Sequence, residues 1–263
     1  MKTKNPARRP QHGFSLLEIL IVVSILGIIS AGILSQMDVA QQRGYSEQVK
    51  LDNFQEARDF VDQFFRDINQ IGYPSSRLID PAAAWAPALV TPSAYSLWAN
   101  PYINDSRLAI GLVSIDAKAV QFEGDMIGNG VVQSIIYQIN GSTGCLLCLQ
   151  RSQVDKVSAD PLLGQPQNWG TEVNDVLSDP IFTYFKADGT QITMAPSSPP
   201  IDISTSAGAQ ILASIKTIKI SLTIRNNSVI DRKTNQAIET NFEGEVSINN
   251  CSMATTGQAT SCQ

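Results

Sequence analysis

The apolar residues of this chain are concentrated first in one long run near the N-terminus. Residues 14–35 contain one charged side chain, Glu18, and the stretch Ile19–Leu34 is interrupted only by small residues. About 20 residues of α-helix cross the hydrocarbon core of a bilayer, which is about 30 Å thick. The pattern therefore predicts a membrane-spanning helix over residues 14–35.

A helical pattern continues after this run, now with one apolar face. Apolar residues recur at spacings of three and four, at Phe54, Ala57, Val61, Phe64, Ile68 and Ile71. Phe60 and Phe65 widen this face, and charged residues occupy the other side. We predict one helix from about Phe14 to Ile71, with soft points at Gly27, Gly32 and Gly44, that ends at Gly72-Tyr73-Pro74.

The rest of the chain has β-type patterns separated by turn residues. Residues 74–107 contain five prolines and predict an irregular connection. The predicted strands are Leu108–Ile115, Ala119–Phe122, Val131–Ile139, Leu147–Ser152, Ile181–Phe185, Ser214–Arg225 and Ile238–Asn249. Loops are predicted at Ser197–Pro200, at Ser204–Gly208 and, as a long hairpin loop, at Asn226–Ala237.

These elements together predict an α+β fold in which the long N-terminal helix packs on an antiparallel β-sheet domain. The predicted divisions are residues 1–13, a leader; 14–35, a transmembrane helix; 36–73, an amphipathic helix; and 74–263, a β-rich head. The chain of 263 residues is long enough for a membrane anchor and one sizeable domain.

Charge is distributed unevenly along the chain. The net charge is −5, and the leader holds four basic and no acidic residues: Lys2, Lys4, Arg8 and Arg9. The positive-inside rule keeps this leader in the cytoplasm and places the head on the other side of the membrane. Because the rest of the chain is acidic, no nucleic-acid-binding surface is indicated.

The composition also argues against an enzyme. His12, in the leader, is the only histidine, which excludes a Ser-His-Asp or Cys-His site in a chain without the leader. There is no G-x-S-x-G motif and no glycine-rich phosphate loop, so we expect neither catalysis nor a cofactor or metal. The alternatives are an exported enzyme with an uncleaved anchor, or one cleaved at the small residues Ser30-Ala31-Gly32.

The four cysteines are Cys145, Cys148, Cys251 and Cys262. An even number in an exported domain favours disulfides, of which three connectivities exist. Cys145 can bond Cys148 only if this segment belongs to the turn that follows Asn140–Gly144, because an extended strand holds them about 10 Å apart. We favour Cys145–Cys148 and Cys251–Cys262; a zinc site, or one disulfide with two free thiols, is the alternative.

Glu18 is the most informative single residue. A charge at bilayer depth costs about 2.5–3.5 kcal/mol on insertion scales, so this carboxylate needs a partner or a purpose. Ser15-Leu16-Leu17-Glu18 fits a capping box, which would use both side chains at the start of the helix.

The segment around Glu18 resembles a known processing site. Gly13-Phe14-Ser15-Leu16-Leu17-Glu18, followed by an apolar run, is similar to the site in type IV prepilins and type II secretion pseudopilins. This resemblance implies cleavage between Gly13 and Phe14 by the prepilin peptidase and N-methylation of Phe14. It also implies that Glu18 meets the Phe14 amine of a neighbouring subunit. One departure is that no proline occurs between Phe14 and Ile71.

Shorter segments resemble PilW-type minor pilins, with GspJ-type minor pseudopilins close behind. They are Phe65–Pro74, Tyr137–Ile139 with Leu149–Arg151, Ile181–Phe185 with Asp188-Gly189, and Ile215–Leu222. The resemblance implies a minor pilin that primes assembly of a type IV pilus at or near its tip, with a link to cell adhesion. The alternative is a minor pseudopilin of a type II secretion system.

The same resemblance implies the partners and the location. The partners would be other minor and major pilins, the prepilin peptidase, the inner-membrane assembly platform and, before assembly, membrane lipid. The protein would cross the inner membrane once, with its C-terminal domain in the periplasm, and then enter the pilus or pseudopilus.

Overall fold

The computed structural model describes residues 15–74, 104–142, 145–177, 179–194, 198–231 and 236–248. Gly13, Phe14, Cys251 and Cys262 lie outside these residues. Contacts within the chain divide it into two compact units, Met1–Gln48 and Val49–Gln263.

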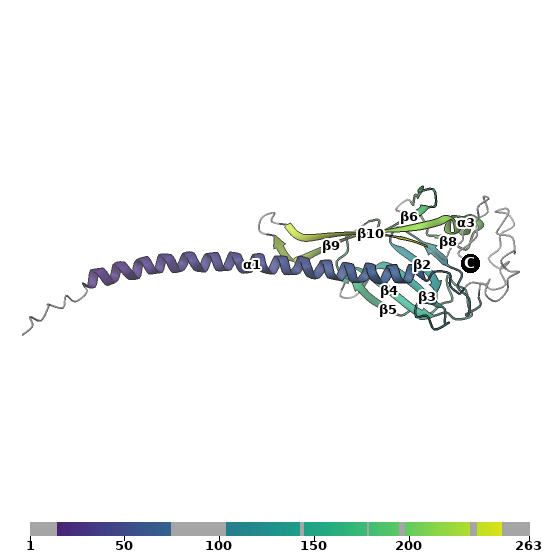
Figure 1. The fold of residues 1–263 in the computed structure, drawn as a ribbon, viewed down its shortest axis with the longest axis horizontal. Helices are drawn as coiled ribbons and strands as arrows, with labels where there is room; N and C mark the ends of the chain where they lie inside the picture. The colour runs from purple at the N-terminus through teal and green to yellow at the C-terminus, as the bar shows by residue number, and fades with distance from the viewer. Residues whose placement is uncertain are drawn as a thin grey trace, which may run out of the picture. The chain divides into compact units, whose positions relative to one another are not determined.

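Helix α1, Leu16–Asn69, is one continuous helix of 54 residues (Figure 1). Its side chains from Leu16 to Asp38 are all exposed in the first unit. By length and composition, this helix is able to cross a membrane. The helix runs unbroken through Gly27, Gly32 and Gly44, so the prediction of one continuous helix is confirmed.

In the second unit, α1 buries one stripe of side chains. The buried residues are Val49, Asn53, Ala57, Phe60, Val61, Phe64, Asp67 and Ile68. Phe54, which the periodicity placed on this stripe, is 42% exposed, so that part of the prediction is wrong. Its ring lies at the edge of the stripe, 5.6 Å from the ring of Phe242.

The predicted stop signal at the end of α1 is confirmed. Gly72 has a φ of +73°, which is a left-handed conformation that glycine adopts without steric cost. Its backbone N–H donates a 2.9 Å hydrogen bond to the carbonyl oxygen of Glu123. The turn therefore ends the helix and joins the chain directly to the sheet.

The second unit contains two antiparallel sheets. The six-stranded sheet has the order β5-β4-β3-β2-β1-β8, and the four-stranded sheet has the order β10-β9-β6-β7. The elements are β1 Leu112–Ile115, β2 Ala119–Gly124, β3 Gln133–Ser142, β4 Cys145–Asp155, β5 Trp169–Val173, β6 Phe182–Lys186, β7 Gln191–Ile192, β8 Ile201–Asp202, α3 Ser206–Ser214, β9 Ile215–Asp231 and β10 Gln236–Ser247. The long apolar helix and the antiparallel sheets confirm the predicted α+β class.

The C-terminal part of α1 packs against both sheets (Figure 1). Phe64 stacks on Phe182 of β6, with the ring centroids 5.6 Å apart. Phe60 meets the edge of Tyr137 of β3 at the same centroid distance. On β10, Gly244 allows close approach, because a Cβ atom there would lie 2.9 Å from the Phe65 ring. One apolar core therefore joins the helix to both sheets.

The hairpin β9–β10 is longer than predicted. Asn226–Ala237 was expected to be a loop, but β9 continues to Asp231 and β10 begins at Gln236. The register shifts here, since Ile238 faces Asn226 whereas Ala237 faces Ile230. Val229 and Ile238 are buried with Val49 in a small second core. Burial of these two side chains extends the strands through a polar sequence.

Other short elements were missed or misplaced. Ser204–Gly208 was expected to be a loop, but Thr205 caps helix α3 by accepting a hydrogen bond from the Gly208 N–H. The edge strands β5, β7 and β8 were not predicted, because they contain two to five residues and lack clear alternation. Strand β4 begins at Cys145 rather than Leu147.

One ion pair is fully buried in the six-stranded sheet. Lys156 Nζ donates to Glu123 Oε2 at 2.7 Å and to the Leu108 carbonyl oxygen at 2.9 Å. Both charged side chains are 0% exposed. Burial raises the pKa of the Glu123 carboxyl, and the Lys156 ammonium opposes that rise. Removing one partner would leave a buried charge uncompensated.

We predict that Lys156→Met lowers the free energy of unfolding by about 3–5 kcal/mol, because Glu123 then remains buried without its cation. The matched control is Lys219→Met, which removes the partner of Glu243 at the surface and should cost less than about 1 kcal/mol. Denaturant unfolding of the full chain in detergent measures both. Equal losses in the two variants would contradict the assigned role of the buried pair.

Candidate functional site

The first candidate site is the start of α1, where Glu18 lies in the first turn. The Ser15 carbonyl oxygen accepts hydrogen bonds from the N–H of Glu18 at 3.0 Å and the N–H of Ile19 at 3.2 Å. Ser15 is thus the residue before the helix and Glu18 its third residue, the positions that a capping box requires. A carboxylate here also interacts favourably with the positive end of the helix dipole.

Glu18 is exposed, and among the described residues no cation lies within ion-pairing distance of it. The nearest charged residue along the helix is Asp38, five to six turns away. An isolated carboxylate on a membrane-capable helix is costly in lipid, and a cation from another molecule would offset that cost. The geometry therefore leaves Glu18 available for an intermolecular contact.

The second candidate site is a charged cluster that joins α1 to the hairpin β3–β4. The Tyr137 hydroxyl donates to Asp67 Oδ2 at 2.6 Å, and Arg151 donates to the same oxygen from Nη2 at 2.7 Å and Nε at 2.9 Å. Gln63 Nε2 donates to the other carboxylate oxygen at 2.7 Å. Both oxygens of the buried Asp67 are therefore satisfied.

The environment of this cluster fixes its charges. The side chains of Arg151 and Asp67 are 12% and 2% exposed. Burial, followed by the charge of Asp67, raises the pKa of Tyr137 well above its ordinary value. The phenol therefore stays neutral at physiological pH, keeps its proton and donates a hydrogen bond to the carboxylate. The cluster is a fixed structural contact between helix and sheet.

Sequence reasoning did not find this cluster, although the signal was present. Asp67, Tyr137 and Arg151 each lie in one of the short segments that resemble minor pilins. In the sequence, Tyr137 and Arg151 each lie in a predicted strand, and neither shows its partner. Only the fold shows that the three side chains meet, because Asp67 is 84 residues from Arg151.

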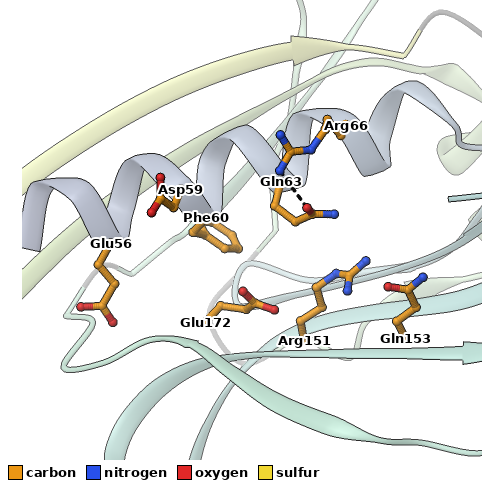
Figure 2. A pocket seen from close by; sticks show the side chains of 8 residues that line it. All are labelled: Glu56, Asp59, Phe60, Gln63, Arg66, Arg151, Gln153 and Glu172. Carbon is orange, nitrogen blue, oxygen red and sulfur yellow. Dashed lines mark hydrogen bonds between the residues drawn. The ribbon is translucent and has the colours of Figure 1, made fainter. Parts of the chain in front are cut away.

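Next to this cluster lies a groove between α1 and the strands β4 and β5 (Figure 2). Its volume is about 480 Å³, and it is lined by Glu56, Asp59, Phe60, Gln63, Arg66, Arg151, Gln153 and Glu172. Two hydrogen-bonded contacts join the helix to the sheet beside this groove. Glu56 Oε1 accepts a hydrogen bond from the backbone N–H of Asn174 at 2.9 Å, and Asp67 accepts one from Arg151 at 2.7 Å. The groove is a polar hollow between these contacts.

The cysteine predictions are tested only in part. Cys148 is buried and belongs to a disulfide whose partner lies outside the described side chains. Cys145 and Cys148 were expected in the hairpin turn, but both are residues of strand β4. Ser142 faces Cys145 and Asn140 faces Cys148, so β4 holds one extra residue between them. This bulge breaks the alternation assumed for an ideal strand, and the pairings stay predictions.

Within the described parts of the chain, no group of three or more His, Cys, Asp or Glu residues is arranged to hold a metal ion. Asp175, in the loop after β5, has a φ of +54°, and its backbone carbonyl accepts a hydrogen bond from the Arg225 N–H. Neither candidate site brings together the acid, base and nucleophile of a catalytic site.

Comparison with known proteins identifies the first site. Residues 8–34 match the family model described as the prokaryotic N-terminal methylation motif. This match covers about a tenth of the 263 residues and includes Glu18. No curated protein matches the chain. The motif supports a type IV prepilin-like protein, which implies in general assembly with other pilins and processing by the prepilin peptidase.

We predict that Tyr137 ionises late in an alkaline titration. Its raised pKa means that the unfolded state loses this proton first, so its contribution to stability decreases above the ordinary tyrosine pKa of about 10. Phenolate absorbance of the folded chain should therefore rise in an early and a late step. Tyr137→Phe should shrink the late step by one tyrosine. An unchanged late step in Tyr137→Phe would contradict the prediction.

Proposed function

We propose that this protein is a minor pilin of a type IV pilus, anchored in the membrane until it is assembled. In this role it joins other minor pilins in a complex that primes pilus assembly at or near the filament tip. The observation that carries the proposal is the methylation motif with Glu18 in the first turn of a helix that has no other charge through residue 37.

Glu18 would act as a positioning group in assembly. Processing between Gly13 and Phe14 creates a new amine at Phe14, four residues before Glu18 in the sequence. A neighbouring subunit's amine can then meet the Glu18 carboxylate in the low dielectric of a packed helix bundle. A pair there is far more favourable than a lone carboxylate, so subunits that align the two groups are selected over those that do not.

The minor rather than the major subunit is proposed for two reasons. The chain of 263 residues carries a large second unit, whereas repeating building blocks are usually smaller. Three of the segments that resemble PilW-type minor pilins also meet in the fold, through Asp67, Tyr137 and Arg151. Because these contacts join α1 to the hairpin β3–β4, they support the proposal that this chain and PilW-type minor pilins join the helix to the hairpin in the same way.

The alternative within the same class is a minor pseudopilin of a type II secretion system, similar to the GspJ type. The methylation motif serves both classes, and Glu18 argues only against the outermost pseudopilin, which characteristically lacks it. The neighbouring genes distinguish the two, because pilus genes and secretin-and-ATPase secretion genes form different clusters. In either case we propose a structural protein and not an enzyme, with its head in the periplasm.

We predict that the mature protein begins at Phe14 and is one methyl group heavier than the unmodified chain. Intact-mass measurement of protein from the native host tests this directly. Gly13→Leu should abolish processing, because the peptidase site requires a small residue before the cleaved bond. A mature chain that starts at Ala31 or Ile33, or normal cleavage of Gly13→Leu, would contradict the proposal.

We predict that Glu18→Ala inserts into the membrane normally but assembles poorly. Removal of the charge makes insertion easier by about 2.5–3.5 kcal/mol, yet it removes the partner for the neighbour's amine. Membrane fractionation and a count of surface filaments measure the two effects. Asp38→Ala, which removes a carboxylate from the same helix, is the control and should assemble normally. Normal filament numbers in Glu18→Ala would show that the carboxylate has no assembly role.

A further inference from the structure

The loop between β2 and β3, residues 125–132, closes around one buried carboxylate. Asp125 is 2% exposed, and its side chain accepts hydrogen bonds from three backbone N–H groups that follow it in the sequence. Oδ1 accepts from Gly128 at 2.7 Å and from Asn129 at 3.2 Å. Oδ2 accepts from Gly130 at 2.7 Å. The carboxylate therefore fixes the backbone of the loop at each of these residues.

Asn129 and Gly130 form a chemically reactive pair at the surface of this loop. In an Asn-Gly sequence, the backbone nitrogen of glycine can attack the side-chain carbonyl carbon of asparagine, since glycine has no Cβ atom to hinder the approach. Both residues are exposed to water. The chain contains a second pair of the same kind, Asn140-Gly141, which serves below as an internal reference.

The reaction needs only water as a second reactant. The nitrogen of Gly130 bonds to Cγ of Asn129, the Cγ–Nδ2 bond breaks, and ammonia leaves with the proton that the Gly130 nitrogen loses. Water then opens the resulting cyclic imide at either of its two carbonyl carbons. One opening gives aspartate, and the other gives isoaspartate, in which the backbone runs through the side chain.

The side chain of Asn129 is oriented for this attack. Its Oδ1 accepts a hydrogen bond from the backbone N–H of Val131 at 2.9 Å. A fixed donor on a carbonyl oxygen stabilises the negative charge that develops there when a nucleophile attacks. The carbonyl carbon of Asn129 is therefore activated in the folded loop.

The attacking nitrogen, in contrast, is restrained by Asp125. The nitrogen of Gly130 reacts only when it gives up its proton, and this N–H is donated to the carboxylate. A carboxylate is too weak a base to remove a proton from a backbone amide. Its negative charge disfavours loss of that proton to any other base, because two negative charges would then lie side by side. The same hydrogen bond that closes the loop therefore opposes the reaction.

We propose that Asn129 is a site of spontaneous modification to aspartate and isoaspartate, and that the Asp125 carboxylate protects this site in the folded protein. Isoaspartate adds one atom to the backbone, so a modified loop does not keep all three N–H groups on Asp125. The backbone N–H of Asp125 donates to the carbonyl oxygen of Tyr73 at 2.8 Å, so modification also disturbs the contact between the end of α1 and the sheet. This inference does not rest on the proposed function.

The experiment follows the rate of modification at both Asn-Gly pairs of the full chain in detergent micelles, by mass spectrometry of peptides that contain Asn129 and Asn140. The folded protein is compared with the same protein in concentrated urea. Asn129 should react at least about tenfold more slowly in the folded protein, the factor expected for one hydrogen bond to a charged group. Equal rates in the two conditions would overturn the proposal.

The variant Asp125→Asn tests the protection directly, because an asparagine side chain has one acceptor oxygen and no charge. Modification of Asn129 should become at least about tenfold faster. Asn140, on strand β3, should change less than about twofold. The matched control is Asp62→Asn, the same change at an exposed position of α1, which should leave both rates within about twofold.

Two results with Asp125→Asn would overturn the proposal. An unchanged rate at Asn129 would show that the carboxylate does not protect the site. An equal rise at Asn129 and Asn140 would show a general opening of the fold in place of a local effect.

Discussion

The architecture of the second unit depends on burial of one stripe of α1 by two sheets at once. Phe64 packs on Phe182 of the four-stranded sheet, while Phe60 packs on Tyr137 of the six-stranded sheet. A helix segment of this length is marginally stable alone in water, because most helical stability in proteins comes from tertiary packing. Neither sheet covers the whole stripe, so the helix and both sheets stabilise one another.

Buried charges make this packing specific to one position of the helix. A shift of α1 by one turn would move Asp67 by about 5.4 Å and leave Arg151 without its carboxylate. Apolar contacts tolerate such shifts better, because one apolar side chain can replace another. The cluster therefore sets the register of the helix against the hairpin β3–β4, and the groove beside it inherits that fixed geometry.

The sequence predicted the parts of the fold that depend on local periodicity. The helix, its end at Gly72 and the strand alternation of Ile218, Ile220, Leu222 and Ile224 are all properties of short windows. The parts that were missed depend on distant residues. Strand β9 continues to Asp231, and β10 begins at Gln236, because Val229 and Ile238 pack on Val49, a contact across about 180 residues.

The candidate sites divide in the same way. Glu18 and its capping position could be predicted, because a charge in an apolar run is visible without any fold. The groove and the buried pair Lys156–Glu123 could not, because each joins side chains from separate elements. Even a local pattern can predict burial wrongly. The helical periodicity placed Phe54 on the buried face, but its side chain is exposed at the edge of the buried stripe.

The place of β10 in the sequence has a consequence for the order of folding. Gly244, near the C-terminal end of β10, lies directly over Val61 and Phe65 of α1. The N-terminal helix is synthesised first, yet the part of its apolar face at Val61 and Phe65 is covered only when β10 has been made. During this interval the face is exposed to other proteins, a state that favours aggregation. The packing of this helix face therefore depends on a strand that lies about 180 residues later in the sequence.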